Sequence, residues 1–199
     1  KENGIEFDKL IISETAEKKY ADTLKDFYKN SKECYKIPDS LFKKISDTNS
    51  PQGIIALAGI LEKSVKIDPK GRYIALENVN DPSNLGAVSR TAEALGVDGI
   101  ILSIDGCDPY SPKSLRASMG TLLRMPVIIL ENFCYDIKNS GLKSFACVVD
   151  KDAQPITDTL FCDGCVIMIG NEANGLTDAA KQMADSLITI SMSGKAESL

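Results

Sequence analysis

The sequence predicts an α/β fold built mainly around a parallel β-sheet. From residue 73 onward, short β-rich runs alternate with helical stretches of about ten residues, a pattern typical of β-α-β units whose sheet is covered on both faces. The expected strands are Tyr73–Leu76, Gly99–Ser103, Val127–Leu130, Ser144–Val149 and Val166–Ile169, and the expected helices are Asn84–Leu95, Pro112–Met119 and Thr177–Ala184. Ligands of such sheets bind at the carboxyl ends of the strands, so the loops that follow these strands are where we expect a site.

The first third of the chain predicts a smaller α/β unit. A short apolar strand is expected at Lys9–Ser13, a helix at Thr15–Lys29 and a second helix at Asp39–Ile45. Gly53–Leu61 reads as a buried strand or as a strand running into a turn.

A linker separates the two parts. Residues 67–71 read IDPKG, and their Pro and Gly interrupt both the helical and the strand pattern of apolar residues. We therefore expect a small domain over 1–66, a linker over 67–72 and a larger domain over 73–199. The abrupt start at Lys1 and the end at Ser198–Leu199 predict that the chain is part of a longer polypeptide.

The composition excludes several classes of site. The 199 residues contain no histidine, which rules out Ser-His and Cys-His catalysis and histidine-ligated metals. Cys162 and Cys165 form a C-x-x-C, but no second pair completes a zinc site, so we favour two small residues leading into a buried strand over a metal or redox site. The longest apolar run falls well short of the roughly 20 residues of a membrane span. We expect a cytoplasmic protein with reduced thiols, no metal and no membrane partner.

The charge is unevenly distributed along the chain. The net charge is -5, but residues 1–72 hold 14 Lys+Arg against 12 Asp+Glu, whereas residues 73–199 hold 9 against 16. The acidic balance argues against a polyanionic partner, and the asymmetry keeps one possible through local patches.

The loop after the first strand of the larger domain has the features of an anion or hydroxyl site. Polar residues follow Leu76 and turn into the N-terminus of a helix, where backbone N–H groups are free and the helix dipole is positive. Ser83 or Asn84 is expected to cap that helix. Arg90, about two turns into it, reads either as a solvated outer-face residue or as a phosphate-binding fork.

The segment Gly170–Thr177 contains two glycines at P-loop spacing but carries Leu176 where the lysine must stand, and no G-x-G-x-x-G follows the first strand. Nucleotide hydrolysis and dinucleotide binding are therefore disfavoured. A glycine-rich turn after a buried strand requires close backbone approach, either to a ligand or to another chain segment. Glu172 is expected to cap the next helix, to meet a positive ligand or to be solvated.

Three ordered segments resemble the motifs of the SpoU-type (SPOUT superfamily, TrmH-like) RNA 2′-O-ribose methyltransferases. The segments are 76–92 (LENVNDPSNLGAVSRTA), 169–172 with Gly175–Leu176, and 190–192 with Gly194 and Ser198–Leu199. The stretches 111–113 and 116–120 match the intermediate segment of that family. Residues 1–66 more weakly resemble the ribosomal-protein-like (L30e-like) substrate-binding domain of many members, here partial.

The resemblance implies a trefoil-knotted parallel-sheet α/β domain that forms a homodimer. It implies a methyltransferase that uses S-adenosylmethionine to methylate a ribose 2′-hydroxyl in ribosomal RNA, with tRNA a less favoured substrate. The third motif of the family continues with a C-terminal helix beyond the positions of Ser198–Leu199, where this sequence stops, and Ser191 stands where proline is usual.

The resemblance also implies roles for individual residues. Arg90, Asn84, Glu172 and Ser198 match the polar active-site positions, and we expect Arg90 to clamp phosphate and hydroxyl groups rather than act as a base. The positions matched to cofactor contacts are Gly170, Ile190 and Leu199, with Met192 in the same loop. The rival interpretations are a catalytically silent RNA-binding relative and a small-molecule α/β enzyme such as a reductase.

Overall fold

The computed structural model describes residues 6–59 and 66–192, and the chain divides into two compact units, 1–62 and 63–199. The first unit is a three-stranded sheet of order β2-β1-β3, in which β2 runs parallel and β3 antiparallel to β1. Its elements are β1 (Phe7–Ser13), α1 (Glu14–Lys19), α2 (Ala21–Lys29), β2 (Ser31–Ile37), α3 (Asp39–Ile45) and β3 (Ile54–Leu57). Its core is a cluster of Leu10, Ile12, Ala16 and Leu24, which packs α1 and α2 against β1.

Two predictions for this unit were wrong. The single helix expected at Thr15–Lys29 is two helices, because the backbone at Tyr20 (φ −115°, ψ 24°) interrupts the helical conformation. Of the two interpretations of Gly53–Leu61, the buried strand is wrong: the strand is Ile54–Leu57, it is not buried, and the chain leaves it at residue 58. Residues 60–61 lie outside the described range. Both edge strands leave side chains exposed, so β2, which is rich in charged residues, gave no apolar signal in the sequence.

The second unit contains a seven-stranded sheet in which every pairing is parallel, which confirms the predicted parallel α/β fold. Its strand order is β6-β5-β4-β9-β7-β10-β8. The strands are β4 (Arg72–Leu76), β5 (Gly99–Ser103), β6 (Val127–Leu130), β7 (Lys143–Cys147), β8 (Gln154–Pro155), β9 (Cys165–Ile169) and β10 (Ser186–Thr189). The helices are α4 (Pro82–Ala94), α5 (Pro112–Ala117), α6 (Thr121–Arg124), α7 (Phe133–Lys138), the 3₁₀ turn η1 (Ile156–Asp158) and α8 (Asp178–Met183).

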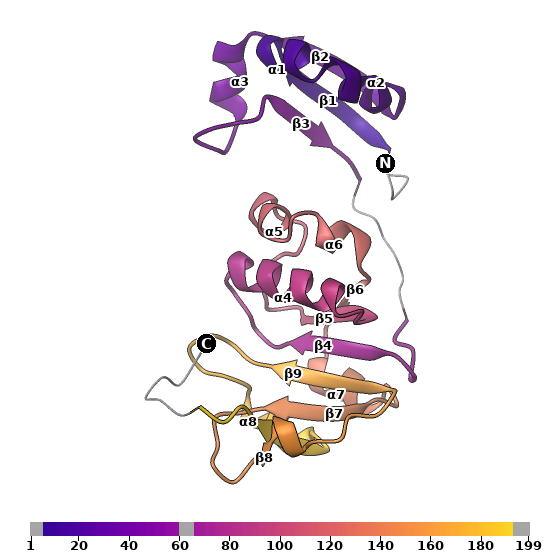
Figure 1. Ribbon diagram of the computed structural model, residues 1–199, viewed down its shortest axis with the longest axis vertical. Helices are drawn as coiled ribbons and strands as arrows, with labels where there is room; N and C mark the ends of the chain where they lie inside the picture. The colour runs from indigo at the N-terminus through magenta and orange to yellow at the C-terminus, as the bar shows by residue number, and fades with distance from the viewer. Residues whose placement is uncertain (1–5, 60–65, 193–199) are drawn as a thin grey trace. The chain divides into compact units, whose positions relative to one another are not determined.

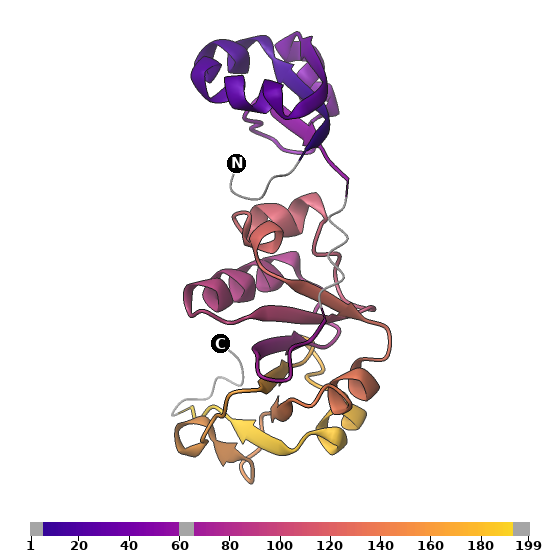
Figure 2. The same cartoon turned by 90° about the vertical axis from the view of Figure 1, so that its right-hand side faces the viewer.

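Helices cover both faces of this sheet (Figures 1 and 2). Alternate residues of β4 serve the two cores: Tyr73 and Ala75 join the cluster that includes α7 and α8, whereas Leu76 joins the cluster that includes α4 and α6. The short elements α6, α7 and β8, of four, six and two residues, were not predicted. No helix within the described ranges is long and apolar enough to cross a membrane.

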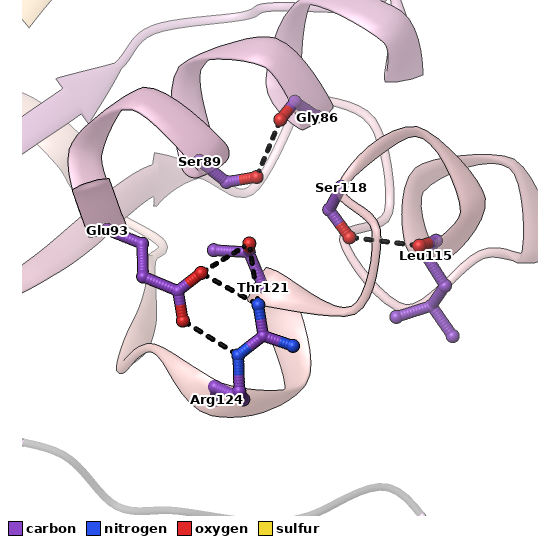
Figure 3. Close-up of polar contacts among 7 residues, drawn as sticks. All are labelled: Gly86, Ser89, Glu93, Leu115, Ser118, Thr121 and Arg124. Atoms are coloured by element: carbon purple, nitrogen blue, oxygen red, sulfur yellow. Dashed lines mark hydrogen bonds and ion pairs between the residues drawn. The ribbon is translucent and has the colours of Figure 1, made fainter.

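Polar contacts and a close approach fix α4 against its neighbours (Figure 3). Glu93 of α4 accepts two hydrogen bonds of 2.7 Å from the Arg124 guanidinium and one of 2.8 Å from the Thr121 hydroxyl, both on α6. The hydrogen bond from Arg124, then that from Thr121, lowers the pKa of Glu93 to about 2. Nearer the start of α4, a Cβ added to Gly86 would lie 2.5 Å from the carbonyl carbon of Ala117 on α5.

Gly86→Ala tests this close packing. We expect the free energy of unfolding to fall by about 1–3 kcal/mol, because the added methyl overlaps rigid backbone, even though alanine by itself favours a helix by about 1 kcal/mol. Urea unfolding of the chain measures the change. Gly59→Ala is the control, since a Cβ there meets no atom within 4 Å; equal effects at the two positions would contradict the interpretation.

Candidate functional site

The candidate site lies where the strand order of the large sheet reverses. The chain passes from β4 outward to β5 and β6 on one side, and then crosses to β7 beyond β9, so that β4 and β9 are neighbours with diverging connections. Such a reversal is where parallel sheets bind ligands, because the loops after the two strands separate and leave a crevice. The two loops here are residues 77–81 after β4 and 170–177 after β9.

Glu172 joins these two loops. Its carboxylate accepts hydrogen bonds from the backbone N–H groups of Asp81 (3.2 Å) and Asn80 (3.4 Å), and from the side-chain amide of Asn84 (2.9 Å). The side-chain amide of Asn171 lies 3.3 Å away and also donates to it. Of the three readings open for Glu172, capping of the following helix is therefore wrong, since its carboxylate bonds to the opposite loop.

The hydrogen bonds keep Glu172 ionised. Partial burial acts to raise the pKa of this carboxyl, but the bonds from Asn84 and from backbone N–H groups, including those of Asp81 and Asn80, outweigh it and lower the pKa overall. A carboxylate stabilised in this way is a weak base near neutral pH. Glu172 is therefore suited to holding the loops rather than to accepting a proton.

The turn after β9 is closed on itself. Asn171 and Gly175 form a bridge of two backbone hydrogen bonds (3.0 and 2.8 Å), and the Asn171 side chain accepts from the N–H of Ala173 at 3.0 Å. A Cβ on Gly170 would lie 2.0 Å from the carbonyl carbon of Gly175. The close approach that the glycines predicted is thus an approach to another part of the same turn.

A second polar contact joins the loops, and the sequence analysis did not identify it. Glu77, only 5% exposed, accepts from the backbone N–H (2.8 Å) and the hydroxyl (2.7 Å) of Thr177. Thr177 in turn caps α8 by accepting from the N–H of Ala180 at 3.2 Å. The sequence did contain one sign of this contact. Glu77 is an acidic residue directly after an apolar strand, at the end of the strand where the site was expected.

The cap of α4 also differs from the prediction. Neither Ser83 nor Asn84 caps this helix; Asp81 does, accepting from the N–H of Ser83 at 2.8 Å, and Pro82 occupies the first turn. Proline is favoured there because its fixed φ suits the helix and it has no N–H to satisfy. Because Asn84 does not cap the helix, its side-chain amide is available to donate a hydrogen bond to Glu172.

Arg90 lies further along α4 and does not contact Glu172. It is exposed, and within the described residues its guanidinium makes no hydrogen bond or ion pair. Helix geometry places it about 9 Å along the axis and about 120° around it from Asn84. The structure therefore brings Asn84 and Glu172 together, but leaves Arg90 as a separate cation on the same helix.

The predicted cofactor positions lie at the ends of β9 and β10. Gly170 follows β9, and Ile190 and Met192 follow β10, with Ile190 44% exposed. Because β9 and β10 both run parallel to β7, all three positions lie at the same edge of the sheet. Ser198 and Leu199 lie outside the described residues. Within the described part of the chain, no group of three or more Cys, Asp or Glu side chains could hold a metal ion.

Comparison with known proteins identifies the class. A model of the SpoU rRNA Methylase family matches residues 71–199, and the chain belongs to this family, which confirms the resemblance predicted above. The 23S rRNA (guanosine(2553)-2′-O)-methyltransferase RlmP of Bacillus subtilis is 28% identical over 169 residues, which are 84% of this chain and 67% of that protein. The 23S rRNA (uridine(2479)-2′-O)-methyltransferase of Streptomyces viridochromogenes is 28% identical over 172 residues, 81% of this chain and 60% of that protein.

Solved structures show the same fold. The AdoMet-bound rRNA methyltransferase of Sinorhizobium meliloti matches with a TM-score of 0.82 at 24% identity, over 100% of this chain and 76% of that one. The SpoU methyltransferase AviRb of Streptomyces viridochromogenes, in complex with AdoMet, matches with a TM-score of 0.82 at 21% identity, over 100% of this chain and 78% of that one. The chain spans about two thirds or less of the curated relatives described above.

The ionisation of Glu172 is open to direct measurement. Its carboxyl should titrate below the ordinary value of 4.5, and Asn84→Ala should move the titration upward by removing one donor. The contribution of Glu172 to folding should accordingly be present above its ordinary value of 4.5 and be lost as the pH falls through its lowered pKa. NMR titration of the carboxyl carbon measures both values, and an unchanged midpoint in Asn84→Ala would contradict the assigned contact.

Proposed function

We propose that this chain is an S-adenosylmethionine-dependent methyltransferase that methylates a ribose 2′-hydroxyl in RNA, with ribosomal RNA the favoured substrate. The observation that carries the proposal is the contact between Asn84 and Glu172 in a chain of the SpoU family. The contact joins the loops after β4 and β9, where the strand order reverses. Relatives named as 23S rRNA 2′-O-methyltransferases support the substrate class.

The residues at this edge of the sheet suit the proposed cofactor. Ile169 and Ile190 are 36% and 44% exposed at the carboxyl ends of β9 and β10, which flank β7, and each is an apolar side chain of the kind an adenine ring contacts. Gly170 adds no side chain beside them. Gly170, Ile190 and Met192, with Leu199, would hold the cofactor. When bound, S-adenosylmethionine supplies a methyl group activated by a sulfonium.

The polar residues of the site have distinct parts in this reaction. The 2′-oxygen would form a bond to the methyl carbon as the methyl–sulfur bond breaks, S-adenosylhomocysteine would leave, and the hydroxyl proton would pass to solvent water. A positive group beside the oxygen would favour the negative charge that develops there. The Arg90 guanidinium is permanently charged and is suited to holding RNA phosphate and the developing oxyanion. Glu172 holds the Asn84 amide in place, and Ser198 is proposed as the further polar residue at the hydroxyl.

The remaining features of the proposal rest on the family for residues 71–199, on the weaker resemblance of residues 1–66, and on the composition for the location. They are the trefoil knot, pairing of two copies into a homodimer, a cytoplasmic location, and an L30e-like RNA-binding role for residues 1–66. The first unit is itself compact, with its own sheet and core, as a separate substrate-binding domain requires.

One experiment tests the activity. The 199-residue chain should bind S-adenosylmethionine with micromolar affinity in calorimetry and should not bind NAD. With labelled cofactor it should transfer methyl groups to unmodified ribosomal RNA, and nuclease digestion should recover them as 2′-O-methyl nucleotides. Cofactor binding without transfer to ribosomal RNA or tRNA would instead favour a catalytically silent relative, and binding of NAD alone would favour a small-molecule enzyme.

The role of Arg90 gives a separate prediction. Arg90→Ala should abolish methyl transfer while leaving cofactor affinity nearly unchanged, because the guanidinium acts on RNA rather than on the cofactor. Arg72→Ala is the matched control, since Arg72 is an exposed arginine at the amino end of β4, the opposite end of the strand from the site. Transfer by Arg90→Ala within about threefold of the parent would remove Arg90 from the mechanism.

A further inference from the structure

Glu77 is a buried carboxylate that the proposed reaction does not use. It is 5% exposed, and no cation pairs with it among the described residues. Burying a charge is costly unless hydrogen bonds compensate for it. A neutral side chain would fill this position at lower cost, so the use of a carboxylate here needs a reason beyond packing.

The hydrogen bonds of Glu77 supply such a reason, because they reach both ends of one turn. Its backbone N–H donates to the carbonyl of Ile169 at 2.9 Å, immediately before the turn. Its side chain accepts from the N–H and the hydroxyl of Thr177, immediately after the turn. The seven residues between, 170–176, include Gly170 and Glu172, so one residue directly after β4 fixes both ends of the segment that carries the candidate site.

The two hydrogen bonds to the Glu77 side chain fix the orientation of Thr177 as well as its distance from Glu77. Each carboxylate oxygen of Glu77 receives one donor of Thr177, so the threonine is held at two points. The same hydroxyl accepts from the N–H of Ala180 and thereby continues the connection into α8. A glutamine at position 77 would place a donating NH2 group where one of the two carboxylate oxygens now accepts, and would remove the negative charge, so the present pair of bonds would be lost.

We propose that Glu77 and Thr177 are positioning residues for the methyl-donor site, which they serve by fixing the turn 170–176 against the end of β4. The identity of the ligand in this inference rests on the proposed function, whereas the hydrogen bonds that fix the turn do not. Because the turn supplies Gly170 to the cofactor and Glu172 to Asn84, loosening it should weaken donor binding.

The test compares Glu77→Gln and Thr177→Val with the conservative Thr177→Ser. In the first two variants we expect backbone amides of Asn171 and Gly175, which are bonded across the turn, to exchange with solvent at least about tenfold faster, since a hydrogen bond to a charged group is lost. The Kd for S-adenosylmethionine should rise by a similar factor. Thr177→Ser keeps both donors and should stay within about twofold of the parent in both measurements.

Thr159→Val is the matched control. Thr159 is another threonine of the second unit whose hydroxyl is hydrogen-bonded; it is buried, whereas Thr177 is exposed, and it donates to the carbonyl of Pro155 at 2.9 Å, outside the turn. This variant should lose stability without changing the exchange of Asn171 and Gly175 or the Kd. The control therefore distinguishes the loss of turn positioning from a general loss of stability.

The outcomes separate this inference from the proposed function. If the parent chain does not bind S-adenosylmethionine, the proposed function fails, and hydrogen exchange still decides whether Glu77 fixes the turn. If the parent binds the cofactor but Glu77→Gln and Thr177→Val leave both measurements within about twofold, the inference is wrong. If Glu77→Gln fails to fold, Thr177→Val and its rescue by Thr177→Ser decide the question.

Discussion

The joining of the loops after β4 and β9 is the constraint on which the candidate site depends. A strand-order reversal separates the connections of two neighbouring strands and by itself leaves their loops free to diverge. Here Glu172 reaches from the second loop to the first, and Glu77 reaches from the first to the far end of the second. The contacts run in opposite directions, so neither loop can move away without breaking hydrogen bonds to a carboxylate.

The sequence predicted the larger unit well because its physical signals are strong. Strands buried on both faces of a parallel sheet are continuously apolar, and the fully buried β5 begins and ends at the predicted residues. The edge strand β6 does so too, because its four residues are all apolar. Signals were weak in two other edge strands, since β2 exposes most of its side chains and β8 has only two residues. The strand order could not be predicted, because periodicity identifies strands without showing which of them are neighbours.

The candidate site was predicted in part, and the limit has a physical cause. Asn84, Glu172 and Gly170 were identified from the motifs, and the structure brings Asn84 to Glu172. Glu77 and Thr177 stand 100 residues apart, and their contact depends on β4 and β9 being neighbours. The misassigned cap at Ser83 or Asn84 was avoidable, since Asp81 followed by Pro82 is a local signal for a helix start.

The distribution of hydrogen bonds at the site bears on how an acidic chain could hold RNA. If Glu172 had formed an ion pair with Arg90, the two charges would have neutralised each other. The structure instead satisfies Glu172 with amide donors, which carry no net charge, and leaves the guanidinium of Arg90 exposed on α4. Amide donors thus compensate the carboxylate that holds the loops, and under the proposed function Arg90 would remain available to bind RNA phosphate despite the net charge of -5.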